Sequence, residues 1–187
     1  SDTRRKCREL LAGLKSCADD EKFVIYKGET AQMGRAIGSL DPSDKFKFVW
    51  SGTVFGAAHP EKDVNGDKMR PGQPVIALRE HGFRGCGVSS ARAALVRAFG
   101  ERYWADSAAF PAMKAIAAPA GLYDRFLADM HGWFALDFRP RVRISLIAHL
   151  SGGSFKSKFA EDMLFSRGLS ADLTDLWEPP SIMRQCK

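Results

Sequence analysis

The sequence has no apolar run that is long enough to cross a lipid bilayer. The longest candidate, residues 144–150, is far shorter than the roughly 20 apolar residues that a membrane-spanning helix needs. We therefore expect no membrane partner and interpret this run as a buried strand. A signal-peptide pattern is also missing, and the first residue is Ser1 instead of Met. We expect that the chain is trimmed at this end and that any targeting segment lies outside it.

Cysteine is scarce and is not spaced for metal binding. None of the four cysteines belongs to a CxxC pair, which argues against a zinc site. The spacing of Cys7 and Cys17 places both on the apolar side of a helix, where a reduced cysteine is an ordinary small core residue. The sequence therefore predicts no metal site and requires no disulfide bond.

No basic segment has the composition that is typical of nucleic-acid recognition. The net charge is +6, but the densest basic clusters, 4–6 and 139–143, lack the interleaved aromatic residues that stack on bases. We therefore expect no nucleic-acid partner. A protein partner of acidic or mixed charge would suit a basic surface of this kind.

What is present is typical of one globular domain. The chain has 187 residues, of which 45% are hydrophobic. Helical spacing of apolar residues predicts helices over 3–18, after Ser90, and within an insertion at about 104–132. Aromatic, β-branched or alternating patterns predict strands at 23–27, 46–50, 74–79, 133–138, 142–150 and 162–165. We therefore predict a monomeric single domain, 1–187, of the α+β class with a split, mostly antiparallel β core.

Residues 59–74 form the longest stretch of turn-forming residues. Prolines and an Asn65-Gly66-Asp67 turn interrupt every periodic pattern in this stretch. Loops of this length are frequently functional or mobile. We expect a surface loop, for which contact with a substrate protein and disorder are equally good explanations.

Three short segments carry candidate chemistry. Val24-Ile25-Tyr26-Lys27-Gly28 ends a predicted strand, and Gly87-Val88-Ser89-Ser90-Ala91 opens a helix. Ala160-Glu161-Asp162-Met163-Leu164-Phe165-Ser166-Arg167-Gly168 places two acids before an apolar triplet and a glycine. In this order the three segments resemble the mono-ADP-ribosyltransferase family of bacterial toxins and effectors, although lysine stands in the first segment where that family usually has arginine.

The resemblance implies a fold and a reaction. The fold would be an ADP-ribosyltransferase-like β core. Such enzymes cleave the nicotinamide–ribose bond of NAD through a positively charged transition state, which a nearby carboxylate stabilises. We expect NAD as the substrate and a host protein as the acceptor; a ubiquitin-like acceptor would fit such effectors, although no residue here indicates it. A virulence protein of this kind would be secreted and act in the host-cell cytoplasm.

The resemblance makes one of the two adjacent acids the catalytic residue. Glu161 is the expected catalytic carboxylate, and Asp162 stays an alternative, because neighbouring side chains on a strand point in opposite directions. A structural interpretation stands beside this one. In it the acids are turn residues that pair with Lys156 or Lys158.

The other two segments would bind the cofactor. The resemblance assigns Lys27 and Gly28 to this role, with the lysine supplying a cation. The serine that orients the ribose would be Ser89 or Ser90, or alternatively Ser51, whose spacing from Lys27 is closer to the usual one. An ordinary helix N-cap explains the serine pair equally well.

Two alternatives to the transferase remain open. Cys86 precedes a predicted helix, where the helix dipole favours a thiolate, and His149 lies late on a predicted strand. This order resembles papain-like proteases and deamidases. The second alternative is a non-catalytic protein-binding domain.

Overall fold

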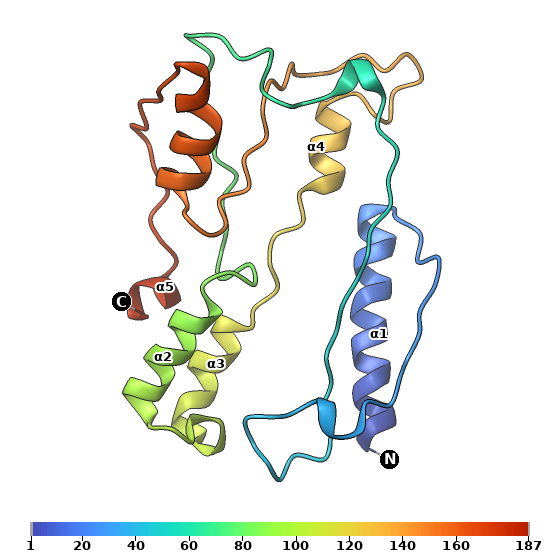
Figure 1. Ribbon diagram of the computed structural model, residues 1–187, viewed down its shortest axis with the longest axis vertical. Coiled ribbons are helices and arrows are strands. Elements are labelled where there is room, and N and C mark those ends of the chain that lie inside the picture. The colour runs from blue at the N-terminus through green and yellow to red at the C-terminus, as the bar shows by residue number, and fades with distance from the viewer. Residues whose placement is uncertain (1, 187) are drawn as a thin grey trace. The chain divides into compact units, whose positions relative to one another are not determined.

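The computed structural model describes residues 2–186, and its regular elements are helices (Figure 1). The α-helices are Asp2–Glu21 (α1), Val88–Phe99 (α2), Phe110–Ile116 (α3), Asp124–Met130 (α4) and Ser181–Gln185 (α5). A π-helix spans Phe155–Leu164 (η5). Short 3₁₀ turns lie at Gly34–Ala36 (η1), Pro60–Lys62 (η2), Tyr103–Ala105 (η3), Ser107–Ala109 (η4) and Phe165–Arg167 (η6).

The contacts of the chain gather in two compact units. Unit 1 consists of Ser1–Ala58 and Leu122–Pro140, and unit 2 consists of His59–Gly121 and Arg141–Lys187. Each unit therefore combines two separate stretches of sequence. The single domain expected from chain length stays a prediction, and the two units are described separately below.

In unit 1, α1 confirms the helix predicted over 3–18. Ion pairs one turn apart support its exposed face: Arg5 contacts Glu9 at 2.7 Å, and Lys15 contacts Asp19 at 2.6 Å. The helix ends at Glu21, and the φ of 61° at the next residue, Lys22, turns the chain out of the helical path. At this end the Glu21 carboxylate accepts a hydrogen bond of 2.7 Å from the backbone N–H of Arg125 in α4. The two helices of unit 1 are joined at this point.

In unit 2, α2 and α3 lie side by side (Figure 1). They confirm the helix predicted after Ser90 and a helix predicted within 104–132. Their core consists of Leu95, Tyr103 and Ala109, which are buried. Further apolar residues pack around these three: Val96, Phe99, Trp104, Ala112, Met113 and Ile116. Apolar residues repeat every three to four positions in both helices, so each helix turns one face toward this core.

The predicted β core is absent from residues 2–186, and the α+β, ADP-ribosyltransferase-like fold prediction is wrong. The single β contact in this range is an isolated antiparallel bridge between Asn65 and Leu146. Segments such as 46–50 have the alternation of strands, but no neighbouring backbone forms a ladder with them. A strand is stabilised by the hydrogen bonds and side chains of its neighbours, so a strand-like pattern alone does not make a sheet.

The acidic segment is helical, so the strand predicted at 162–165 is also wrong. It belongs to η5 and η6. Apolar residues recur here at Phe155, Phe159, Met163 and Leu164, which is a helical spacing, and Leu164 is the buried member. The short apolar triplet after the acids gave a strand signal only because it was considered apart from the residues before it.

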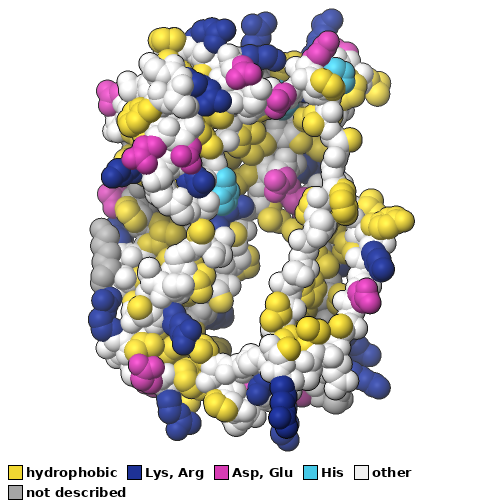
Figure 2. Space-filling view, viewed as in Figure 1, with side chains coloured by type: hydrophobic (Ala, Val, Ile, Leu, Met, Phe, Trp, Pro, Cys, Tyr) yellow, Lys and Arg dark blue, Asp and Glu magenta, His cyan; other side chains and the backbone are white. Residues whose placement is uncertain are grey.

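Many large apolar side chains are exposed. Figure 2 shows hydrophobic side chains at the visible surface among those of lysine and arginine. The extreme cases include Val54 and Phe55 of unit 1, which are both 92% exposed. Among the described residues, no helix combines the length and the apolar character that crossing a bilayer requires.

Candidate functional site

The glycine-rich turn that leads into α2 is the best-defined polar site in unit 2. Gly85 and Gly87 have φ values of 77° and 80°, which are left-handed conformations that a side chain disfavours. At Gly87 an added Cβ would also lie 3.2 Å from the ring of Phe83. The turn therefore needs glycine at Gly87 both for its backbone and for its packing.

A half-buried ion pair anchors the residues before this turn. The Arg84 guanidinium donates to the Glu80 carboxylate at 2.9 Å and also to the carbonyl of Gly121. Glu80 in turn accepts hydrogen bonds from the backbone N–H groups of His81 at 3.0 Å and Gly121 at 3.1 Å. We call Glu80, Arg84 and Gly121 the clamp, because they join the start of the turn to the segment after α3.

The clamp favours the ionised form of Glu80. Partial burial by itself would raise the pKa of this carboxyl group. The hydrogen bonds from the backbone N–H groups of His81 and Gly121, together with the Arg84 charge, outweigh that effect and hold the pKa of Glu80 below its ordinary value. The Glu80 carboxylate of the clamp is therefore ionised at neutral pH.

The first turn of α2 presents free hydrogen-bond donors. The N-cap is Gly87, which has no side chain, and the first helical hydrogen bond runs from Ala91 N–H to the Gly87 carbonyl at 3.0 Å. The N–H groups of Val88, Ser89 and Ser90 precede that bond, as the first N–H groups of any helix do. A helix N-terminus with a glycine turn and exposed hydroxyls can hold an anion such as a phosphate. The serines are therefore not N-caps, because the helix begins before them.

The predicted cofactor-binding residues are divided between the two units. Lys27, Gly28 and Ser51 belong to unit 1 and are exposed, and Lys27 pairs with exposed Glu29 at 3.8 Å. Ser89 and Ser90 belong to unit 2. Neither unit by itself contains the complete predicted set, and the cofactor-binding role of these residues stays a prediction.

The two acids of the third segment are exposed on η5. Asp162 pairs with Lys158, four residues earlier, at 3.5 Å. This contact is the one that the structural interpretation expected. Glu161 forms no ion pair within the described residues. The catalytic role of either acid stays a prediction.

The cysteine and histidine of the alternative reading both belong to unit 2. Cys86 is exposed in the glycine turn, and His149 is exposed in an irregular segment. No hydrogen bond between the two is formed in residues 2–186. Within the same range, no group of three or more His, Cys, Asp or Glu side chains is arranged to hold a metal ion.

The loop 59–74 is anchored, which the sequence did not indicate. Gly66 donates to the Ser145 carbonyl at 3.1 Å, and Gln73 donates to the Ser145 hydroxyl at 2.9 Å. Arg167 donates to the Asn65 carbonyl at 3.0 Å, and its guanidinium lies where a Cβ at Gly66 would point. These partners are about 70 to 100 residues away, so no local pattern could reveal them.

Comparison with known proteins gives a consistent set of distant relatives. Phosphoribosylformylglycinamidine cyclo-ligase from Pyrococcus furiosus is 26% identical over 149 residues, which cover 80% of this chain and 39% of that protein. The enzyme of the same name from Thermococcus gammatolerans is 27% identical over 145 residues, covering 78% of this chain and 38% of the relative. That from Methanobrevibacter smithii is 24% identical over 184 residues, covering 96% of this chain and 48% of the relative.

The chain spans less than half the length of these curated relatives. No family model matches it, and no solved structure matches it. The relatives are named as ligases. This contradicts the predicted NAD-dependent ADP-ribosyltransferase activity and the description of the chain as a toxin or effector. NAD as a substrate, a host-protein target, the monomeric state and secretion into a host cell are not addressed by these relatives and stay predictions. What the chain resembles, at low identity and over most of its own length, is a cyclo-ligase.

Proposed function

We propose that this chain belongs to an enzyme that binds a phosphoribosyl compound and closes a ring in it, as the cyclo-ligases do by name. One observation carries the proposal. Relatives from several organisms share the same name, and one of them aligns with 96% of this chain. The substrate in that name has a phosphate, a ribose, a formyl group and an amidine.

The α2 N-terminus is the part of unit 2 that suits the phosphate of such a compound best. Its N–H groups at Val88, Ser89 and Ser90 point out of the helix end, and the positive end of the helix dipole favours an anion there. The glycine turn gives a ligand access to the backbone, and the clamp holds the turn in place. Ser89 and Ser90 would add hydroxyl donors.

Binding of phosphoribosylformylglycinamidine to the 187-residue chain tests the proposal. Isothermal titration calorimetry compares this compound with its riboside, which lacks the phosphate. We expect the phosphorylated compound to bind at least 10-fold more tightly. Equal binding of the two compounds, or no binding of either, would contradict the phosphate site.

Paired variants then locate the site. The double substitution Ser89→Ala with Ser90→Ala removes two donors, and it should weaken binding of the phosphorylated compound about 3- to 10-fold, on the scale of one or two hydrogen bonds. Ser170→Ala, an exposed serine elsewhere in unit 2, is the matched control and should bind like the parent. If the control loses as much affinity as the double variant, the α2 assignment is wrong.

Turnover is measured separately by mass spectrometry of the cyclised product. The reactions are run with and without ATP and Mg²⁺, because ligases as an enzyme class couple bond formation to cleavage of a nucleoside triphosphate. We expect product formation that requires the nucleotide. Binding without turnover would support the binding half of the proposal and contradict ring closure by this chain alone.

A further inference from the structure

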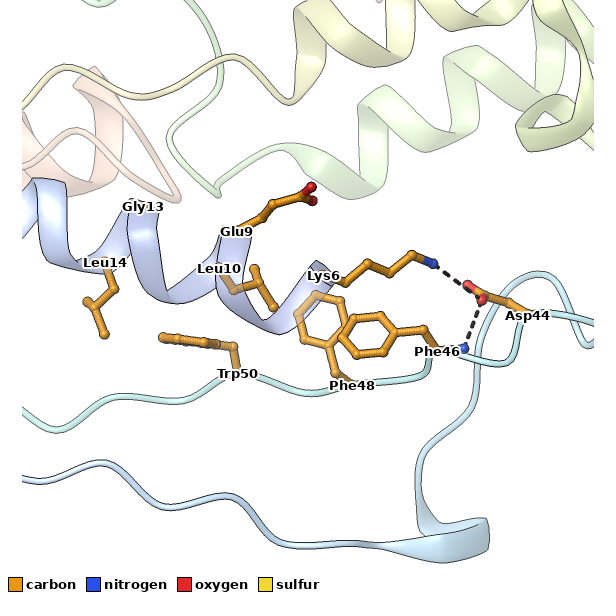
Figure 3. Close-up of a pocket in the computed structure, with 9 residues that line it drawn as sticks. All are labelled: Lys6, Glu9, Leu10, Gly13, Leu14, Asp44, Phe46, Phe48 and Trp50. Atoms are coloured by element: carbon orange, nitrogen blue, oxygen red, sulfur yellow. Dashed lines mark hydrogen bonds and ion pairs between the residues drawn. The ribbon is translucent and has the colours of Figure 1, made fainter. Parts of the chain in front are cut away.

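The groove of unit 1 between α1 and the segment 44–50 has its charged side chains paired within the chain. Figure 3 shows Lys6 beside Asp44, where the Lys6 ammonium lies 4.0 Å from the carboxylate and 5.2 Å from the centre of the Phe46 ring. Glu9 pairs with Arg5 at 2.7 Å. The stronger feature lies in unit 2, where one arginine joins the loop 59–74 to a helix of unusual register.

Arg167 connects the loop 59–74 to the end of η5. Its guanidinium donates to the Asn65 carbonyl in the loop at 3.0 Å and to the Met163 carbonyl in η5 at 3.0 Å. Gly66 makes this approach possible, because a Cβ at that position would lie 3.2 Å from the Nε atom of Arg167. A single side chain is therefore in contact with both segments.

The helix η5 has the hydrogen bonds of a π-helix over ten residues. Phe159 donates its N–H to the Ser154 carbonyl at 3.2 Å, and Phe165 donates its N–H to the Ala160 carbonyl, in each case five residues back. π-helices are rare, and most are single turns inside an α-helix. A π-helix of this length therefore needs contacts that hold its register.

Both ends of η5 have features that fit a held register. At the start, Ser154 has a φ of 45° and a ψ of −131°, a conformation that a residue with a side chain rarely adopts. At the end, the side chains of Ser166 and Arg167 donate to carbonyls four residues back, at 3.2 and 3.0 Å. In an α-helix a carbonyl accepts the backbone N–H four residues on. These side chains therefore supply what the backbone supplies in the α register.

We propose that Arg167 is a latch that holds η5 in the π register while the loop 59–74 is docked on it. When the loop leaves Arg167, η5 relaxes to the α register. The two registers differ in residues per turn, so the change rotates the exposed Glu161 and Asp162 about the helix axis relative to the buried Leu164. The loop and the acidic segment therefore change together. This inference does not depend on the proposed cyclo-ligase function, because it concerns a part of unit 2 other than the α2 turn.

Couplings across hydrogen bonds, measured by NMR on the isotope-labelled 187-residue chain, identify the register directly. The parent should show a coupling between the Phe159 N–H and the Ser154 carbonyl. Arg167→Ala should move that coupling to the Phe155 carbonyl, four residues back. A coupling that stays with Ser154 in this variant would overturn the latch, and a coupling to Phe155 in the parent would overturn the held π register.

Two glycine substitutions in the loop test the latch while Arg167 stays in place. Gly66→Ala directs a methyl group at the guanidinium and should also move the Phe159 coupling to Phe155. Gly72→Ala is the matched control, because Gly72 has a similar φ, 86° against 93°, but an added Cβ there would meet no atom within 4 Å. This control should keep the parent register. The same register in the two variants would overturn the role of the Arg167 contact.

Hydrogen exchange at Gly66 measures the coupling in the opposite direction. The Gly66 N–H is bonded to the Ser145 carbonyl at 3.1 Å, so its exchange rate reports whether the loop is docked. Arg167→Ala should raise this rate at least 10-fold, whereas Arg184→Ala, which removes an exposed ion pair with Glu178, should leave it unchanged. Circular dichroism checks that both variants are folded, and if Arg167→Ala is not, the glycine pair decides. Equal exchange rates in the parent and a folded Arg167→Ala would contradict the latch.

Discussion

Unit 1 and unit 2 contain similar apolar side chains but cover them differently. In unit 2, Leu95 of α2 is buried together with Tyr103 of η3 and Ala109 of η4, and α3 packs against them. In unit 1, α1 has one buried residue, Ala18, and the aromatic residues of 46–50 stay partly exposed. The difference teaches that helices can form a core with helices nearby in the sequence. Strand-like segments, in contrast, need the backbone of a neighbouring strand to form hydrogen bonds with before they can cover their apolar side chains.

The largest expected effect is in the core of unit 2. Leu95→Ala removes a buried side chain and should lower the free energy of unfolding by about 2–4 kcal/mol. Leu11→Ala on α1, where the side chain is 58% exposed, should change it by less than about 0.5 kcal/mol. Urea unfolding followed by circular dichroism measures both. Equal losses for the two variants would remove the contrast between the units.

The next effect tests the clamp. Glu80→Gln removes the carboxylate charge beside the half-buried guanidinium of Arg84, and should lower the free energy of unfolding by about 1–2 kcal/mol at neutral pH. Glu178→Gln, which removes a largely exposed ion pair with Arg184, is the matched control and should cost less than about 0.5 kcal/mol. The same urea measurement compares them.

The clamp also predicts a direction for pH dependence. The pKa of Glu80 is lower in the folded chain, so its contribution is fully present above the ordinary glutamate value of about 4.3 and is lost as the pH falls through the lower folded value. Between pH 5 and pH 3 the parent should therefore lose more stability than Glu80→Gln does. If the free energy of unfolding falls in parallel for the two proteins over this pH range, the lowered pKa of Glu80 is contradicted.

A smaller effect, of opposite sign, is expected on α1. Gly13→Ala should raise the free energy of unfolding by about 0.5–1 kcal/mol, because alanine loses less conformational freedom in a helix and the position is open. Thermal unfolding followed at a helix-specific wavelength measures the gain. A loss of stability would mean that space at Gly13 is needed for the fold of unit 1.

The smallest effect is expected at a highly exposed aromatic residue of unit 1. Phe55→Lys should change the free energy of unfolding by less than about 0.5 kcal/mol and should raise solubility. Phe99→Lys, which removes an aromatic ring packed on the core of unit 2, should destabilise by at least about 2 kcal/mol. Chemical unfolding and the concentration limit of the soluble protein test the pair. A large cost at Phe55 would show that unit 1 buries this ring.

The candidate site was partly readable from the sequence. The segment from Cys86 to Ser90 stood out as a glycine-rich helix start, and the structure has a helix there. Its anchoring was not readable, because Gly121 lies 37 residues from Arg84 and nothing in either local pattern links them. The acids Glu161 and Asp162 stood out for the wrong structural reason, since they lie on a helix instead of a strand.

The sequence by itself determined the helices α1, α2 and α3. Their hydrogen bonds join residues four apart, and their apolar faces repeat within the same window, so the information is local. Only the tertiary structure decided that 46–50 has no strand partner and that loop 59–74 is held by Ser145 and Arg167. Those outcomes depend on contacts between residues far apart in the chain, and a local pattern states what a segment can do but not which neighbour it meets.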